Sequence, residues 1–306
     1  MSNICYDKSL YLLPFDHRGS FKRQLFGWSG NLTPEQTSHI VQAKQVIYDG
    51  FRSAIALGVP KAKAGILVDE QFGAAILRDA AEREYTTCCS AGRSGNDELE
   101  FGDEFTAHVG EFSPTFCKVL ARYNPNGDTA VNKRQSARLK KVSDYLNNTN
   151  RSLFMLELLV PPLDARSQQA RQNKDSYDLN LRPRLMAQAI VQLRQAQVEP
   201  DIWKIGDLDR REDCERMVAA VKRGGGKKAG CIISSRGEDE FKVRRRIETA
   251  AAVPGFVGFA VGPTTFWNAL MSWRQGRITQ EQAVAKIAQR YREFVDIFEE
   301  TAYAAA

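Results

Sequence analysis

The feature of this sequence that most constrains its fold is a repeated switch between short apolar runs and longer amphipathic stretches. An apolar run at residues 10–17 is followed by an amphipathic stretch at residues 34–57, and the pattern recurs to the end of the chain. Short apolar runs suit strands, and stretches with apolar residues three or four positions apart suit helices. Strands that alternate with helices in this way are typical of parallel sheets covered by helices.

The pattern predicts eight strands, at residues 10–17, 65–70, 85–91, 115–123, 153–160, 202–208, 230–234 and 255–261. The expected helices lie at residues 34–57, 73–84, 103–112, 129–147, 181–197, 211–223, 238–252, 265–274 and 280–301. No strand is followed by G-x-G-x-x-G, and two helices close the chain, which favours a closed barrel over an open doubly wound sheet. We therefore expect an α/β fold: a single-domain (β/α)8 TIM barrel over residues 1–306, with extra C-terminal helices and a frayed tail at residues 302–306.

Composition narrows the possible partners and the cell compartment. The chain carries a net charge of +6, but its densest basic run, Lys242 to Arg246, has acidic neighbours on both sides. This arrangement is typical of a solvated helix face and predicts no nucleic-acid partner. The N-terminus has no signal-peptide core, and prolines and Glu157 interrupt the longest apolar run. We expect a cytoplasmic protein without a membrane partner, which forms a homo-oligomer and binds a small molecule.

The cysteines do not suggest a metal site. They lie at Cys5, Cys88, Cys89, Cys117, Cys214 and Cys231. No C-x-x-C pair and no cysteine–histidine cluster with the spacing of zinc ligands occurs among them. We expect reduced, buried thiols and neither a metal nor a cofactor.

Ionisable residues interrupt several of the apolar runs. Lys118, Glu157 and Lys204 lie within the predicted fourth, fifth and sixth strands, and Asp16 and His17 end the first. In a barrel of this type the strands bring such residues together at one end, where active sites lie. The alternation of a strand predicts that Lys204 and Glu157 point inward while their apolar neighbours point outward. We expect one shared pocket.

Two lysines and a carboxylate in one pocket suit imine chemistry. A second cation nearby favours the neutral amine, and a neutral amine is a nucleophile that can attack a ketone. We predict that Lys204 is this nucleophile, that Lys118 is the nearby cation, and that Glu157 carries protons while the carbinolamine loses water. Asp16 is the fourth predicted catalytic residue, and His17, Asp69 and Glu70 are expected substrate contacts.

Two other interpretations of these residues stay open. The lysines and Glu157 could form a structural ion-pair network, because such networks also perturb pKa values. Alternatively, a divalent metal could bind to Asp16, Asp69, Glu70 and Glu157, although the lysines would repel it. We rank the metal below the imine.

The ends of the seventh and eighth strands match the common phosphate site of barrels, which uses glycines, backbone N–H groups and a helix N-terminus. The sequence has Ser234, Ser235 and Arg236 after one strand and Gly262 after the other. We expect these residues to bind an anion, with Arg236 as a forked donor. A plain surface turn explains the same residues about as well.

Several longer stretches resemble one family. They begin at Pro14 (PFDHRGSF), Gly65 (GILVDEQFG), Lys118 (KVLARYNP), Glu157 (ELLVP), Pro200 (PDIWKI) and Leu208 (LDRREDCE). These stretches look like the class I aldolase domain of bacterial inositol catabolism, which cleaves 2-deoxy-5-keto-gluconate 6-phosphate to dihydroxyacetone phosphate and malonate semialdehyde. A more distant resemblance is to tagatose-bisphosphate aldolases. The resemblance to the inositol-catabolism aldolase domain implies a lyase in which Lys204 forms the imine, Lys118 and Glu157 assist it, and Asp16 and His17 contact the sugar.

The chain also departs from that family. Relatives usually have an arginine after the eighth strand, where this chain has Pro263, and a glutamate on the sixth, where it has Gly206. Gly92 and Arg93 replace Glu-Lys after the third strand. Arg18, Arg93 and Arg122 complete the expected substrate contacts. The alternatives are therefore an aldolase for an altered or unphosphorylated substrate and a non-catalytic sugar-binding barrel.

Overall fold

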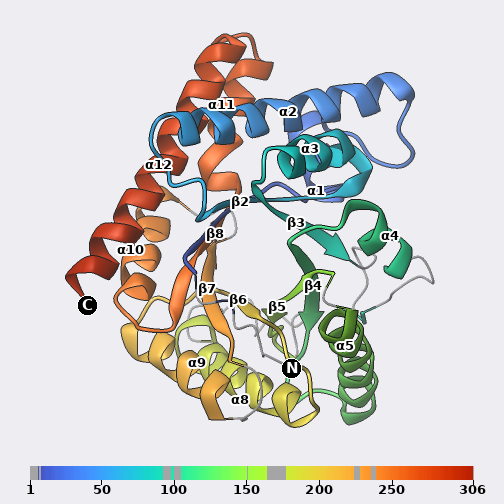
Figure 1. The fold of residues 1–306 in the computed structure, drawn as a ribbon, viewed down its shortest axis with the longest axis vertical. Coiled ribbons are helices and arrows are strands. Elements are labelled where there is room, and N and C mark those ends of the chain that lie inside the picture. Colours follow the sequence, from blue (N-terminus) through green and yellow to red (C-terminus); the bar gives the residue numbers. More distant parts are fainter. Residues whose placement is uncertain are drawn as a thin grey trace.

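The eight strands close into a parallel barrel. The computed structural model describes residues 6, 8–91, 98–99, 105–149, 151–163, 177–223, 228–235 and 239–305. Each strand pairs with the next in sequence, and β8 pairs with β1 to complete the circle. Helices surround the strands on the outside (Figure 1). The predicted (β/α)8 barrel is confirmed.

The strand bounds agree with the sequence patterns to within a few residues. They are β1 (Leu10–Pro14), β2 (Ala64–Val68), β3 (Thr86–Ala91), β4 (Phe116–Arg122), β5 (Leu153–Leu159), β6 (Ile202–Gly206), β7 (Gly230–Ser235) and β8 (Phe256–Val261). The first strand ends earlier than expected, so Asp16 and His17 lie in the loop that follows it. That loop still leaves the barrel at its C-terminal end, where the functional groups of such barrels lie.

The described helices are α1 (Gly19–Phe26), α2 (Pro34–Ala56), α3 (Glu70–Glu82), α4 (Phe105–Phe112), α5 (Thr129–Thr149), α8 (Arg182–Gln195), α9 (Arg211–Arg223), α10 (Glu240–Ala251), α11 (Pro263–Arg274) and α12 (Gln280–Ala304). A π-helical turn, η1 (Tyr177–Leu181), precedes α8. Periodicity predicted neither η1 nor the short α1. Within the described residues, no helix is both long enough and apolar enough to cross a membrane.

Helix ends follow local capping rules. Thr33 caps α2 in a reciprocal pair with Gln36, and Pro34 occupies the first helical position, where proline is favoured. Asp69 caps α3 through the backbone N–H of Phe72, so Asp69 and Glu70 begin a helix and do not end β2. At the other end of the chain, α12 continues through Ala304, beyond the expected start of a frayed tail. Alanine has the highest helix propensity, which explains the extension.

Two apolar cores lie on the two faces of the barrel wall. The larger one packs the outer face of the strands against the helices and includes Trp203, Ile205, Leu156 and Leu158. The smaller one fills the barrel interior with side chains from all eight strands: Leu10, Leu12, Leu67, Cys88, Phe116, Met155, Ile202, Ile232 and Ala260. The outward orientation expected for the neighbours of Lys204 and Glu157 is therefore confirmed.

The seam between β1 and β8 depends on a glycine. Gly258 is paired in register with Leu10, and a Cβ at Gly258 would overlap the backbone carbonyl of Leu10. Backbone atoms of a paired strand cannot move aside as the end of a flexible side chain can. The barrel therefore closes at a point where only glycine fits.

We expect Gly258→Ala to lower the free energy of unfolding by about 3 kcal/mol, because the added methyl group forces β1 and β8 apart. Urea denaturation followed by circular dichroism measures the change. Gly19→Ala is the matched control, since its Cβ would meet only the flexible end of Arg23, at 3.4 Å. Equal stability of the two variants would contradict this account of the seam.

Candidate active site

A polar layer lies directly above the apolar interior of the barrel. Lys118, Glu157 and Lys204 each lie two residues beyond an interior apolar residue of the same strand, namely Phe116, Met155 and Ile202. Residues two apart on a strand share a face, so the three ionisable side chains point into the barrel. The exposed fraction is only 8% for the side chains of Lys118 and Lys204 and 10% for that of Glu157.

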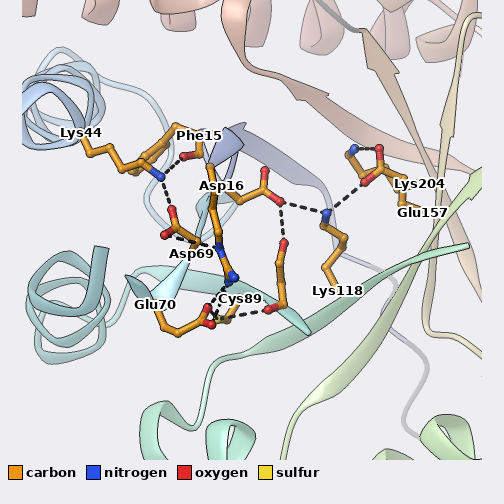
Figure 2. Close-up of polar contacts among 11 residues, drawn as sticks. Phe15, Asp16, Lys44, Asp69, Glu70, Cys89, Lys118, Glu157 and Lys204 are labelled. Carbon is orange, nitrogen blue, oxygen red and sulfur yellow. Dashed lines mark hydrogen bonds and ion pairs between the residues drawn. The ribbon is translucent and has the colours of Figure 1, made fainter. Parts of the chain in front are cut away.

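Glu157 joins the two lysines into one chain of contacts. Its Oε1 lies 2.5 Å from Nζ of Lys204, and its Oε2 lies 3.1 Å from Nζ of Lys118. Lys118 also contacts Oδ2 of Asp16 at 2.9 Å, and the hydroxyl of Ser90 donates to the same oxygen at 2.5 Å. Figure 2 shows the chain running from Asp16 through Lys118 to Glu157 and Lys204. The structure thus brings together the four residues that the sequence predicted as catalytic.

Strand register explains why these contacts form. Glu157 and Lys204 are direct partners across β5 and β6, and Ser90 and Lys118 are direct partners across β3 and β4. The pairing of β4 with β5 places Lys118 opposite Met155, one inward position below Glu157. The long lysine side chain spans this offset. Ser90 was missed in the sequence, although it lies two residues after the interior Cys88.

The surroundings of Asp16 and Lys118 shift their pKa values strongly and so determine the charges of both side chains. Burial acts to raise the pKa of Asp16, but Lys118, His17 and the hydrogen bond from Ser90 outweigh it and hold the pKa well below its usual range. Burial likewise acts to lower the pKa of Lys118, but Asp16 and Glu157 outweigh it and raise the pKa well above its usual range. Asp16 is therefore an anion and Lys118 a cation across the physiological pH range.

His17 lies beside this chain of ionic contacts, and its imidazole is neutral at neutral pH. Burial is the main cause that lowers the pKa of His17, and the cations Lys118 and Lys204 lower it further, against the opposing effect of Asp16. Its Nδ1 atom is buried and has no hydrogen-bond partner among the described residues. A buried polar atom normally has a partner, so a ligand oxygen or a water molecule would suit this position.

A second ionic cluster lies on the β1 and β2 side of the mouth. Nη2 of Arg18 lies 2.8 Å from both carboxylate oxygens of Glu70, and the Cys89 thiol is 3.7 Å from the same group. The side chains of Arg18 and Glu70 are about one fifth exposed, at 23% and 20%. Asp69 is fully buried, where it pairs with Lys44 and caps α3. Arg18 and Glu70 are thus open to a substrate, whereas both oxygens of Asp69 are engaged within the protein.

Lys44 was missed because it lies on a helix. It occupies the apolar face of α2, one turn after Ile40, and is fully buried. Burial lowers the pKa of Lys44, and the charge of Asp69 opposes that shift. A lysine on the apolar stripe of a helix was the available sequence signal, because lysine is almost never fully buried unless it is paired.

The ends of β7 and β8 meet closely. Ser234 and Ser235 are buried, and the hydroxyl of Ser234 has no partner among the described residues. Gly262 packs so tightly against Pro14 that a Cβ would overlap the Pro14 carbonyl oxygen. Pro263 starts α11 and has no N–H to offer a ligand. The predicted contacts Arg93 and Arg236 lie outside the described residues.

A cavity of about 200 Å³ lies at the ends of β4, β5 and β6. Arg122, Leu159 and Gly206 contribute to its lining, and they follow Lys118, Glu157 and Lys204 along the inward face of their strands. Arg182 forms part of the wall and is held by Asp178 and Asp207 at 3.1 and 3.2 Å. The guanidinium of Arg122 has no such partner among the described residues. The cavity therefore presents a hydrogen-bond donor at the ends of the strands that carry the polar layer.

A larger cavity, of about 490 Å³, lies outside the barrel between α10, α11 and α12, and none of Lys118, Glu157 and Lys204 lines it. Among the described residues, no three His, Cys, Asp or Glu side chains gather closely enough to hold a metal ion. Glu157 contacts two lysines, and Asp69 is occupied by Lys44. The chemistry that this layer offers is that of amines and carboxylates.

Comparison with solved structures defines the class of fold. The protein is similar to the fructose-bisphosphate aldolase of Plasmodium falciparum, solved with TRAP and a small-molecule inhibitor. The TM-score is 0.62 over 98% of this chain and 92% of that chain, at 12% identity. It is also similar to Cgl0159 from Corynebacterium glutamicum, with a TM-score of 0.57 over 96% of this chain and 88% of that chain, at 13% identity. The protein thus shares the (β/α)8 barrel fold of these two structures.

The chain belongs to the family described as an uncharacterized protein conserved in bacteria (DUF2090), whose model matches residues 5–302. No curated protein matches the sequence.

We expect Glu157→Gln to lower the free energy of unfolding by about 3 kcal/mol, because it removes the negative charge that both buried ammonium groups contact. Thermal and urea unfolding at pH 7 measure the loss. Glu111→Gln is the control, since Glu111 pairs with Arg78 in an exposed ion pair of similar length, 3.1 Å. Exposed pairs contribute little, so the control should unfold as the wild type does. A Glu157→Gln protein of wild-type stability would contradict the coupling of the two lysines.

Proposed function

We propose that this protein is a class I aldolase, a lyase that uses Lys204 to form a Schiff base with a ketone substrate. The observation that carries the proposal is the buried chain in which Glu157 contacts Lys204 at 2.5 Å and Lys118 at 3.1 Å. Lys118 is held as a cation by Asp16 and Glu157, so a second positive charge beside it is unfavourable. Transfer of a proton from Lys204 to Glu157 relieves that repulsion and yields the nucleophilic amine.

The proposed steps conserve atoms and charge. The Lys204 amine adds to the substrate ketone to give a carbinolamine, which takes a proton at its hydroxyl from Glu157 and loses water as the iminium ion forms. A base then removes the proton of the hydroxyl one carbon beyond the bond that breaks. The electrons of the broken carbon–carbon bond move toward the iminium nitrogen, which leaves an enamine and releases an aldehyde. Protonation and hydrolysis of the enamine return the lysine.

A keto-sugar acid phosphate is the substrate class we favour, with 2-deoxy-5-keto-gluconate 6-phosphate as the first candidate. Support comes from the sequence resemblance together with the polar groups around the mouth. His17, Arg18 and Glu70 would bind hydroxyl groups, and Ser234, Ser235 and Gly262 would lie near an anionic group. The homo-oligomeric state and the cytoplasmic location stay predictions from the sequence.

An unphosphorylated or otherwise altered substrate is the main alternative, and one observation favours it. Pro263 occupies the first position of α11, where it removes an N–H from the phosphate site expected there. Turnover of paired phosphorylated and plain ligands distinguishes the two substrates. A non-catalytic sugar-binding barrel would instead give a thermal shift with these ligands and no product.

Reduction of the protein with borohydride in the presence of dihydroxyacetone phosphate should attach the ketone to Lys204, because borohydride converts the imine to a stable amine. Mass spectrometry of the digested protein locates the added mass. Lys204→Met should abolish both the adduct and turnover, whereas Lys63→Met, at a lysine paired with Glu299, should leave both unchanged. An adduct elsewhere, or turnover that survives in Lys204→Met, would rule out the imine mechanism at this residue.

Arg122→Gln should raise KM about 10- to 100-fold for a substrate with a free carboxylate or phosphate, since a charge-assisted hydrogen bond contributes roughly 1.5–3 kcal/mol. The value of kcat should change little, because Arg122 lies beyond the reacting atoms. Steady-state kinetics with charged and neutral substrate analogues measure the effect. Arg78→Gln, at an exposed arginine on α3, is the control. Equal KM changes for charged and neutral analogues would rule out anion binding by Arg122.

A further inference from the structure

Lys44 lies at the point where α2 meets the ends of β1 and β2, and its exposed fraction is 0%. Its Nζ donates a hydrogen bond of 2.9 Å to the carbonyl of Phe15 and forms an ion pair with Asp69. The rings of Phe21 and Phe72 lie 5.5 and 5.6 Å from the same atom. The ammonium group is therefore enclosed by two oxygen acceptors and two aromatic rings.

Packing alone does not explain a charged group at this position. An apolar side chain of similar length would fill the same space on the inner face of α2 without the cost of taking an ammonium out of water. What a lysine adds is a directed donor. Its acceptors are the carboxylate of Asp69 and the carbonyl oxygen of Phe15.

That carbonyl belongs to the peptide group that joins Phe15 to Asp16. A peptide group is planar and stiff, so a bond to its oxygen also fixes its nitrogen, which belongs to Asp16. The β1 strand ends at Pro14, and the last backbone bond in this segment runs from the N–H of Phe15 to the carbonyl of Leu67, at 2.8 Å. Beyond that bond, Lys44 is the contact that holds the chain as it enters Asp16.

The ion pair of Lys44 with Asp69 reaches the loop that follows β2. Asp69 accepts from the N–H of Phe72 at 2.9 Å and lies 3.7 Å from Nε of Arg18. One lysine thus connects α2 with the loop after β1 and the first turn of α3. Figure 2 shows Lys44 with Phe15 and Asp69 on one side of Asp16, and Lys118 on the other.

We propose that Lys44 is a positioning residue for the polar layer of Lys118, Glu157 and Lys204 and for Asp16, which contacts it. It fixes the Phe15–Asp16 peptide so that the Asp16 carboxylate stays 2.9 Å from Nζ of Lys118. Its effect on Lys204 is indirect and runs through Asp16 and Lys118. This inference rests on the proposed imine chemistry for its consequence in catalysis, while the geometric part of it stands on the contacts of Lys44 alone.

The test uses two variants that separate charge balance from positioning. Lys44→Met alone leaves the buried Asp69 carboxylate without its lysine partner and is expected to lose stability. The double variant Lys44→Met/Asp69→Asn removes both charges and keeps a capping oxygen for α3, because asparagine is as good an N-cap as aspartate. Its stability should therefore recover, while the Phe15 carbonyl stays without its donor.

Pentane-2,4-dione is the probe for Lys204. A primary amine adds to one of its carbonyls, water leaves, and a conjugated enaminone forms whose absorbance reports the rate. We expect the double variant to react about 10- to 100-fold more slowly at Lys204 than the wild type, as expected for misplaced groups. In an Asp16→Asn background, the same two substitutions should change the rate less than about threefold, because the group through which Lys44 acts is already lost.

Two results would overturn the proposal: a wild-type rate in the double variant, or an equal rate loss with and without Asp16. Lys63→Met is the control for loss of a lysine–carboxylate pair away from the mouth and should react as the wild type does. If wild-type Lys204 does not react at all, the aldolase proposal fails, and a crystal structure of the double variant still decides the role of Lys44. Asp16 should then have left Lys118, and an unchanged contact would refute positioning.

Discussion

The polar layer of the barrel depends on one shared carboxylate, that of Glu157. Glu157 contacts both Lys118 and Lys204, in a layer where these three side chains are at most 10% exposed. With Asp16 included, two anions face two cations, so the layer is neutral as a whole. Moving a proton from Lys204 to Glu157 keeps it neutral. The expense of burying charge therefore does not oppose the step that would create a nucleophile.

The apolar interior of the barrel lies directly below this polar layer and supports it. All eight strands contribute apolar side chains to the interior, and the next inward position of β4, β5 and β6 is ionisable. The apolar side chains fill the barrel below the layer, and the side chain of Lys204 is only 8% exposed. Low solvent access strengthens each charge–charge contact in the layer. The same alternation sends Trp203 and Ile205 outward to anchor β6 against the helices.

The sequence predicted the parts of this arrangement that have a period. Apolar runs identified the strands, and Lys118, Glu157 and Lys204 stood out because a charge within such a run is rare. Lys44 did not stand out, because amphipathic helices are full of lysines and its place on the apolar stripe becomes visible only when the face is known. Asp69 was assigned to a strand end, whereas its capping role depends on where α3 begins. The tight contact of Gly262 with Pro14 has no local signal, because it joins opposite ends of the chain.

The two ionic clusters at the mouth differ in how their protons can move. Glu157 lies between two amines, so a proton has a short path between Lys204 and the carboxylate. The pair of Lys44 and Asp69 is sealed from solvent and tied to backbone groups at both ends, through the carbonyl of Phe15 and the N–H of Phe72. Any proton transfer there would break contacts that hold two loops. The contacts of Glu157 are therefore suited to proton transfer, and the Lys44–Asp69 pair is suited to holding the two loops in place. Asp16 lies between the two groups of contacts.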